Sequence, residues 1–156
     1  MINKPTEKLI LGWREWVSLP ELDIPLIKVK IDTGARSSAL HAFVIDPYRK
    51  GGQHWVMFAI HPKQKNDVSI ECHAPIKDRR LVTDSGGHKQ RRYVIETRLV
   101  LGHMAINAEI TLTNRDSMLF RMLLGRTAMN NGFIIDPGAS YLLGKPEQNP
   151  DPHNDR

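Results

Sequence analysis

The feature of this 156-residue sequence that most constrains its fold is a period of two in its apolar residues. Ile27, Val29 and Ile31 alternate with lysines, and the segment from Ile106 to Leu112 alternates in the same way. Successive side chains of a strand point to opposite faces, so this pattern is typical of half-buried strands in an antiparallel sheet. The predicted strands span residues 26–31, 39–44, 55–60, 92–101 and 106–113.

Turn-forming residues separate these strands and leave little of the chain for helices. Gly-Gly occurs at residues 51–52, Asp-Ser-Gly-Gly at 84–87 and Pro-Gly at 137–138. Short strands at this spacing predict an all-β fold, a small closed β-barrel or sandwich, with one short helix at residues 127–131. We expect three parts, listed in chain order: an N-terminal extension at 1–7, one folded domain at 8–144, and a disordered, proline-containing tail at 145–156.

The charge balance of the chain favours an acidic partner. A net charge of +5 and a pI near 9.5 exclude an acidic solvating chain and fit nucleic acid, anionic lipid or an acidic peptide as the partner. One cysteine, Cys72, excludes an internal disulfide, and the alternation around it predicts a buried thiol. No apolar run reaches the ~20 residues of a membrane span or forms the core of a signal peptide. We therefore expect a cytoplasmic protein without a membrane segment.

A carboxylate stands at the end of one predicted strand. Asp32 directly follows the alternating run, and Gly34 allows another backbone to approach closely. Thr33 can hydrogen-bond to neighbouring backbone and fix the loop, and Ser38 can donate a hydrogen bond to Asp32. Arg36 places a cation where it can bind a substrate carboxylate. The plainer alternative is an Asx turn that joins two strands.

A second motif lies near the end of the predicted domain. The apolar residues 122–124 lead into Gly125, and the predicted helix follows directly. A glycine at this place lets a strand pass close behind the loop that carries Asp32. We therefore predict that Leu124, Gly125 and Arg126 support the site structurally.

These two segments together resemble the retropepsin-like aspartic proteases. Asp32-Thr33-Gly34-Ala35, with Ser38 and Leu40, resembles their active-site signature, and residues 123–126 resemble the apolar-apolar-Gly-Arg stretch before their single C-terminal helix. More narrowly, residues 8–144 resemble a bacterial and archaeal family often labelled "ATP-dependent zinc protease". The resemblance implies a retropepsin-like closed β-barrel with Asp32, Thr33 and Gly34 as catalytic residues. The sequence departs from the retropepsin pattern at Thr127, where Asp or Asn is usual.

The resemblance implies an aspartic endopeptidase, and that chemistry needs a second carboxylate. Aspartic peptidases activate a water between two carboxylates that share one proton. The chain holds one full signature, so a symmetric homodimer would bring two copies of Asp32 together. Asp84-Ser85-Gly86 is an allowed variant of the motif, but it lies too close to Asp32 in sequence for a second lobe. We predict a flap or hairpin turn at residues 84–87 instead.

The family label and the residues disagree over cofactors. None of the seven histidines forms the close pair on a helix that a zinc peptidase uses, and no Gly-rich phosphate-binding loop of the ATP-binding type occurs. Cys72 and His73 are adjacent in a predicted strand, so their side chains should point to opposite faces. We therefore expect no metal site and no cofactor.

Basic residues are concentrated between residues 77 and 98, in the region assigned to the flap. A solvated basic face is the plain interpretation, and the alternative is a cleft mouth that selects an acidic protein or peptide substrate. The resemblance adds that members of the family accompany a ligase that adds glutamates to a ribosomal protein, which suggests acidic tails as substrates. The predicted substrate-binding residues are Ala35, Arg36, Ser38, Arg91 and Arg92.

Four functions stay open for the sequence. The first is a homodimeric aspartic peptidase that acts through a pair of Asp32 carboxylates. The second is a catalytically silent retropepsin-like module that binds an acidic peptide or protein. The third is a small β-barrel that binds nucleic acid, which the aromatic content of 6% and the lack of an evident cluster of exposed aromatic residues disfavour. A metallopeptidase is the fourth.

Overall fold

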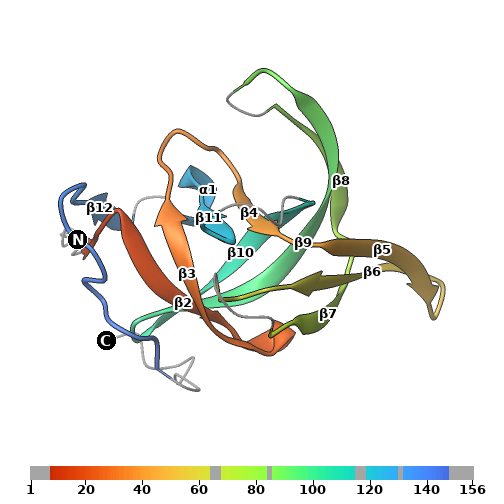
Figure 1. The fold of residues 1–156 in the computed structure, drawn as a ribbon, viewed down its shortest axis with the longest axis horizontal. Helices are drawn as coiled ribbons and strands as arrows, with labels where there is room; N and C mark the ends of the chain where they lie inside the picture. The colour runs from red at the N-terminus through yellow and green to blue at the C-terminus, as the bar shows by residue number, and fades with distance from the viewer. Residues whose placement is uncertain (1–7, 64–67, 84–85, 115–118, 130–131, 148–156) are drawn as a thin grey trace, which may run out of the picture.

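The computed structural model describes residues 8–63, 68–83, 86–114, 119–129 and 132–147 of the chain, and nearly all of its regular elements are strands (Figure 1). The strands in chain order are β1 Leu9–Leu11, β2 Arg14–Leu19, β3 Ile24–Ile31, β4 Ser38–His41, β5 Val44–Lys50, β6 Gln53–Ile60, β7 Ile70–Pro75, β8 Asp78–Thr83, β9 Lys89–Leu101, β10 Met104–Thr113, β11 Met122–Leu124 and β12 Phe133–Ile135. A 3-10 turn, η1 Pro20–Leu22, follows β2, and the α-helix α1 spans Arg126–Met129. The predicted helix therefore forms one residue early, and residues 130–131 lie outside the described part of the chain.

The strands are distributed over three sheets. The largest has the order β10-β4-β11-β3-β2-β9-β8, with a further pairing between β9 and β10, and the others are β5-β6-β7 and β1-β12. The all-β, retropepsin-like prediction is confirmed. The predicted closed barrel is not confirmed. Strand β2 pairs with β9 at a single residue pair, Ser18 with Val100, and the sheets β5-β6-β7 and β1-β12 are separate from the large sheet. The sheets therefore do not form one true barrel.

The large sheet is mixed, whereas the alternation of the sequence suggested an antiparallel one. β4 runs parallel to β10 and β11 runs parallel to β3, while β2–β3 and β9–β10 are antiparallel. Alternation reports which side chains are buried and carries no information on the direction of the neighbouring strand. The parallel pairs join strands that are distant in sequence, and this arrangement positions the loop that follows β3.

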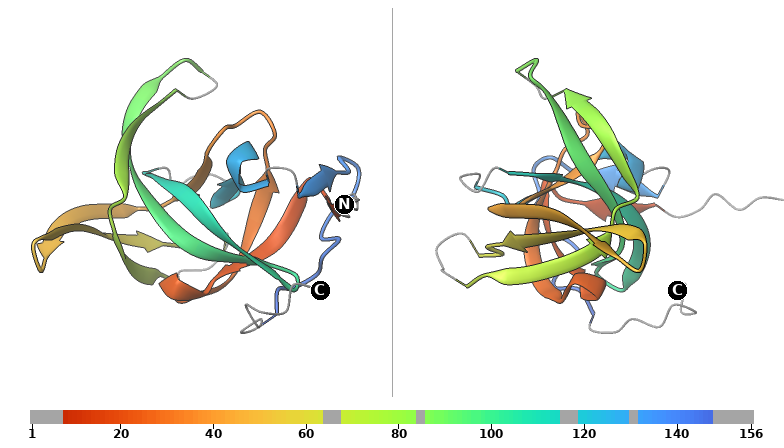
Figure 2. Two further views of the ribbon diagram at one scale, coloured as in Figure 1. Left: turned by 180° about the vertical axis from the view of Figure 1, so that it is seen from behind. Right: turned by 90° about the vertical axis from the view of Figure 1, so that its right-hand side faces the viewer.

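The β8–β9 hairpin is the longest projection near that loop. Its strands pair from Asp78 with Val94 to Thr83 with Lys89. The views in Figures 1 and 2 agree that the hairpin and the loop between β3 and β4 project toward the same end of the molecule, while β5 and β6 extend to one side. Asp84 and Ser85 of the predicted turn lie outside the described residues, and the strands on either side pair as a flap hairpin requires.

The core joins the large sheet to the sheet of β5, β6 and β7. Buried residues of β6 and β7, such as Phe58 and Cys72, belong to the same cluster as Ile27 and Ile95 of the large sheet. Cys72 is 2% exposed, as predicted, and burial together with the carboxylates of Asp23 and Glu71 raises the pKa of its thiol to about 12. Among the described residues, the helices fall short of the length and hydropathy that crossing a bilayer requires.

Candidate functional site

The loop of residues 32–37, called the site loop below, connects β3 to β4 around a third strand. β11 lies between them, parallel to β3 with Leu124 beside Ile31, and antiparallel to β4 with Leu123 beside Ala39. The backbone N–H of Asp32 donates to the carbonyl of Leu124 over 2.9 Å. The site loop must therefore pass over the end of β11, which fixes where Asp32 stands.

Gly125 lies against the backbone of the site loop. A Cβ at this position would stand 2.5 Å from both the carbonyl carbon and the carbonyl oxygen of Ser37, closer than real side chains approach. The Gly125 N–H donates to the buried hydroxyl of Ser38 over 3.1 Å. Only a residue without a side chain fits here, because any Cβ would collide with backbone that cannot move aside.

The start of α1 holds the site loop from the other side. Arg126 donates from Nη1 to the carbonyls of Thr33 and Gly34 over 3.1 and 3.2 Å, and its backbone N–H donates to the carbonyl of Ala35 over 2.8 Å. The N–H of Thr127, the departure from the retropepsin pattern, donates to the carbonyl of Arg36 over 3.1 Å. Arg126 and Thr127 thus donate to four consecutive carbonyls of the site loop.

Ser38 has a different partner from the one expected. Sequence analysis expected its hydroxyl to donate to Asp32, and in the structure this hydroxyl accepts the Gly125 N–H. Oδ1 of Asp32 instead accepts the N–H of Gly34 over 3.0 Å, which closes an Asx turn at the head of the site loop. The Asx turn that sequence analysis gave as the plainer alternative is therefore present at Asp32. The predicted homodimer, with two paired Asp32 carboxylates, stays a prediction.

The site loop presents two charged side chains to solvent. Asp32 is half-buried, while Thr33, Gly34 and Arg36 are exposed. Within the part of the chain that the structure describes, Arg36 forms no ion pair. Arg36 lies four residues after Asp32 on a loop whose backbone is held by hydrogen bonds, so an incoming acidic group can bind its guanidinium without breaking a salt bridge.

Arg91 and Arg92, the two other predicted binding cations, are consecutive residues of β9. Consecutive strand residues point to opposite faces, so these two arginines lie on opposite faces of the hairpin. Arg91 is exposed beside Leu81, whereas Arg92 is half-buried, pairs with Arg80 across the hairpin and donates from Nε to Gln90 over 3.2 Å. The structure therefore separates two residues that sequence analysis grouped together.

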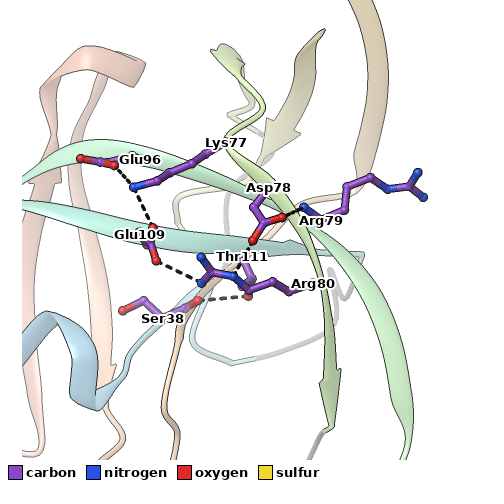
Figure 3. A network of polar contacts seen from close by, with 8 residues as sticks. All are labelled: Ser38, Lys77, Asp78, Arg79, Arg80, Glu96, Glu109 and Thr111. Carbon is purple, nitrogen blue, oxygen red and sulfur yellow. Dashed lines mark hydrogen bonds and ion pairs between the residues drawn. The ribbon is translucent and has the colours of Figure 1, made fainter.

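A polar network at the base of the hairpin was not found by sequence analysis (Figure 3). Glu109 of β10 binds Lys77 and Arg80, with Oε2–Nζ and Oε1–Nη1 distances of 2.8 and 3.0 Å. Lys77 also pairs with Glu96, and Arg80 with Asp78. On the same strand as Glu109, Thr111 donates to the carbonyl of Ser38 over 3.0 Å. The charged residues of these strands could have suggested ion pairs from the sequence. Which residues pair could be known only from the pairing of β9 with β10.

The described residues do not assemble a group of three or more His, Cys, Asp or Glu that could hold a metal ion. His73, next to Cys72, instead bonds through Nδ1 to the hydroxyl of Tyr48 and through Nε2 to Glu71, over 2.9 and 3.0 Å. Cys72 and His73 do point to opposite faces of β7, one buried and one exposed.

One solved structure has the same fold. The crystal structure of the Legionella pneumophila protein Lpg0085, titled as a protein with unknown function (DUF785), superposes with a TM-score of 0.72 and 25% identity. The superposition covers 88% of this chain and 99% of that one. The fold described above is therefore shared by an experimentally determined structure.

Curated relatives carry a ligase name. A probable alpha-L-glutamate ligase of Shewanella pealeana is 45% identical over 139 residues, which cover 88% of this chain and 30% of the relative. The protein of the same name in Desulfotalea psychrophila is 43% identical over 145 residues, covering 92% of this chain and 31% of the relative. The chain thus spans under a third of the length of these curated relatives.

These names contradict the prediction that the chain is an aspartic peptidase. Four curated relatives at 43–45% identity are named ligases, and a ligase forms a bond, whereas a hydrolase breaks one with water. The assignments as a hydrolase and as a protease are therefore corrected.

The family comparison gives the relationship of the chain itself. A model of the RimB-like family, described as retropepsin-like aspartic endopeptidase RimB, matches residues 10–146. This description and the ligase name of the curated relatives differ in the reaction that they imply, so membership establishes the fold and leaves the reaction to direct tests. By the match of its sequence over nearly all of the described fold, this chain belongs to the RimB-like, retropepsin-like family.

Proposed function

We propose that this chain is a retropepsin-like module that binds glutamate-rich peptide segments at the site loop. The observation that carries the proposal is Arg36, an exposed cation without an ion pair among the described residues, on a loop whose backbone is held from both sides. Fixed backbone lowers the entropy that binding must overcome, so a single charged contact retains more of its energy.

The chemistry of the relatives supports a glutamate-rich ligand. Their name is probable alpha-L-glutamate ligase, and this chain matches about 30% of their length. A module that binds glutamate residues would hold the peptide that such a ligase extends or has extended. The net charge of +5 adds a long-range attraction for a ligand of this kind.

The two charged groups of the site loop have different parts in this binding. The guanidinium of Arg36 can donate two parallel hydrogen bonds to a glutamate carboxylate, which is the geometry that arginine favours. Asp32 repels glutamate side chains, so it directs them toward Arg36 and leaves its own free oxygen to accept a peptide N–H. We include a cytoplasmic setting in the proposal, since the chain's one cysteine, Cys72, is a free buried thiol.

The proposal is tested by the affinity for fluorescein-labelled hexaglutamate, measured by fluorescence anisotropy. We expect the wild-type chain to bind hexaglutamate and to bind hexaglutamine much more weakly. Arg36→Gln should weaken hexaglutamate binding by about tenfold or more, because a charge-assisted contact is lost. Arg49→Gln is the matched control, since Arg49 is also exposed but lies on β5, in the separate sheet of β5, β6 and β7.

Salt and product analysis complete the test. Raising the ionic strength should narrow the difference in hexaglutamate affinity between the wild-type chain and Arg36→Gln, because salt screens exposed charges. Equal affinity for the two peptides, or equal losses in Arg36→Gln and Arg49→Gln, would overturn the proposal. Release of shorter glutamyl peptides by the wild-type chain would contradict a role limited to binding.

A further inference from the structure

We propose that strand β8 is an open sheet edge that pairs with an extended acidic segment of a partner protein, and that Arg79, Lys89 and Arg91 select this segment by its charge. The proposal adds a second interaction surface to the chain. It does not rest on Arg36 or on the binding proposed at the site loop. The outer face of the β8–β9 hairpin is defined here as the face that carries Arg79, Leu81, Thr83, Lys89, Arg91 and Tyr93.

Strand β8 stands at the end of the large sheet. It is the last member of the strand order β10-β4-β11-β3-β2-β9-β8, and within the described residues it pairs with β9 alone. One row of its backbone N–H and C=O groups therefore faces away from β9. An edge of this kind is a template to which a further strand can be added.

The register of the hairpin gathers exposed side chains on the outer face. Directly opposite residues of an antiparallel pair share a face, and so do alternate residues of one strand. The opposite pairs of the outer face are Arg79 with Tyr93, Leu81 with Arg91, and Thr83 with Lys89. Leu81 is 56% exposed, and the three cations are exposed as well. The outer face is therefore turned to solvent.

The cations of the outer face are not balanced by acidic groups of the chain itself. Among the described residues, the side chains of Lys89 and Arg91 form no ion pair and no hydrogen bond. The guanidinium of Arg79 lies over the ring of Tyr93, 5.2 Å from its centroid, and has no carboxylate partner in the same part of the chain. These three charges can therefore bind incoming carboxylates without giving up an ion pair.

The cations at the base of the hairpin are in a different state. Glu109 binds both Lys77 and Arg80, whereas Arg79 points away from this network in Figure 3. An acidic ligand would have to break these ion pairs to bind at the base. The base therefore anchors the hairpin, and the outer face is the part of it that is open to an acidic partner.

Charge and geometry together determine which partner fits. A second copy of this chain would bring the same cations against one another, and the net charge of +5 adds to that repulsion. A nucleic acid would satisfy the cations, but it has no peptide backbone to pair with the open edge. An extended polypeptide with an acidic side chain at every second residue satisfies both, because alternate side chains of the added strand project to the outer face.

Pairing with the edge is tested with a fluorescein-labelled peptide of alternating glutamate and valine. Anisotropy is measured with the Arg36→Gln chain, which lacks the cation proposed to bind glutamate at the site loop. We expect binding, together with slower amide hydrogen exchange in β8. Peptides N-methylated on all glutamates or on all valines are blocked on opposite edges, so one of them should bind at least about tenfold more weakly than the other.

Three results of this experiment would overturn the pairing. They are no binding, equal affinity for the two N-methylated peptides, and binding that leaves the exchange of β8 unchanged. Each of them leaves the binding of hexaglutamate by the wild-type chain, and with it the proposed function, unaffected. Exchange of β8 that slows as the concentration of the chain alone is raised would assign the edge to a second copy instead.

Selection by charge is tested with the same peptide. Because neighbouring strands lie about 4.8 Å apart, Arg79 of β8 is next to the added strand and Arg91 of β9 is one strand further away. Adding Arg79→Gln to the same chain should weaken binding by about tenfold, and adding Arg91→Gln by about threefold. Arg49→Gln, in the separate sheet of β5, β6 and β7, is the matched control and should have little effect. Equal losses in all three variants would overturn the selection, and oligouridylate binding as tight as that of the peptide, with the same losses, would show a general polyanion surface.

Discussion

At the scale of single residues, Gly125 is the position where the site tolerates least change. Its missing side chain lets the loop backbone pass where a Cβ would lie 2.5 Å from Ser37. The motif allowed this close approach to be predicted, because a glycine before a short helix has few other uses in a strand-rich chain. The partner at the contact, the backbone of Ser37, could not be predicted without the pairing of β11 with β3 and β4.

Gly125→Ala should lower the free energy of unfolding by about 3 kcal/mol, because the added methyl group meets rigid backbone. Urea denaturation followed by circular dichroism measures this value. Gly138→Ala is the control, since a Cβ there would have Asp136 Oδ1 as its nearest neighbour at an ordinary 3.6 Å. An equal, small loss in both variants would show that the site loop can move aside.

Glu15 shows what residue patterns cannot predict. It lies in β2, and its side chain is fully buried. Its oxygens accept backbone N–H groups from Gly12, Leu142 and Leu143 over 2.7, 3.0 and 3.2 Å. A glutamate in an alternating strand is normally assigned to the solvent face, and these donors lie mostly near the other end of the chain. The sequence around Glu15 therefore contained no local signal that its side chain is buried and binds these backbone groups.

At the scale of elements, the base of the hairpin contains a like-charge pair. Glu96 and Glu109 are directly opposite in the β9–β10 ladder, an arrangement that destabilises a sheet unless a cation lies between. Lys77 bridges the two carboxylates. Its hydrogen bond, followed by that of Arg80, holds the pKa of Glu109 below its ordinary value of 4.5. The N–H of Arg79, followed by the Arg80 side chain, lowers the pKa of Asp78.

These shifts predict that the hairpin loosens in acid. A carboxyl group with a lowered pKa in the folded state stabilises the fold above its ordinary pKa, and that contribution is lost as the pH falls through the folded value. Hydrogen exchange of β8 and β9, corrected for intrinsic rates, should show less protection as the pH falls below about 4.5. In the Glu109→Gln variant, β8 and β9 should be less protected from exchange at neutral pH, and their protection should change less as the pH falls. An equal loss of protection in acid in the variant and the wild type would show that protonation of Glu109 is not its cause.

The elements that could be predicted were those with a clear period and length. Strands were predicted inside β3, β6, β9 and β10, and each is longer in the structure than the pattern suggested. β1 and β12 have three residues each and were missed, because a parallel pair of such short strands exists only through contacts between distant segments. β5 contains Pro47, which disfavours strand in a local pattern and is tolerated here in an edge strand of its sheet.

At the scale of the whole molecule, the C-terminal segment closes the fold over β2. Tyr141 stacks on Trp16 with ring centroids 5.3 Å apart, and the N–H of Glu147 donates to the carbonyl of Gly102 over 2.8 Å. Glu15 lies beneath this segment and binds two of its N–H groups. Residues 145–147 of the predicted tail are within the described part of the chain, and residues 148–156 lie outside it.

Removal of the Glu15 carboxylate should therefore destabilise the whole chain. Glu15→Ala leaves three backbone donors without their acceptor, so we expect a loss of more than about 3 kcal/mol in the free energy of unfolding. Glu21→Ala is the control, because Glu21 is exposed and accepts one backbone N–H, from Arg98, over 2.8 Å. Chemical denaturation of the two variants measures the difference. Similar small losses would mean that the C-terminal segment contributes little to stability.

The support of the site loop by Gly125 and Arg126 also determines when the site can form during folding. Ser38 and Gly125 are 87 residues apart in sequence, and Arg126 is 93 residues from Thr33. Contacts at such separations form slowly, because a long stretch of chain must be ordered to close them. A nascent chain that has not yet reached residue 126 cannot hold the loop in its final shape. The binding proposed at the site loop should therefore begin only after residue 126 has been synthesised and α1 has folded against the loop.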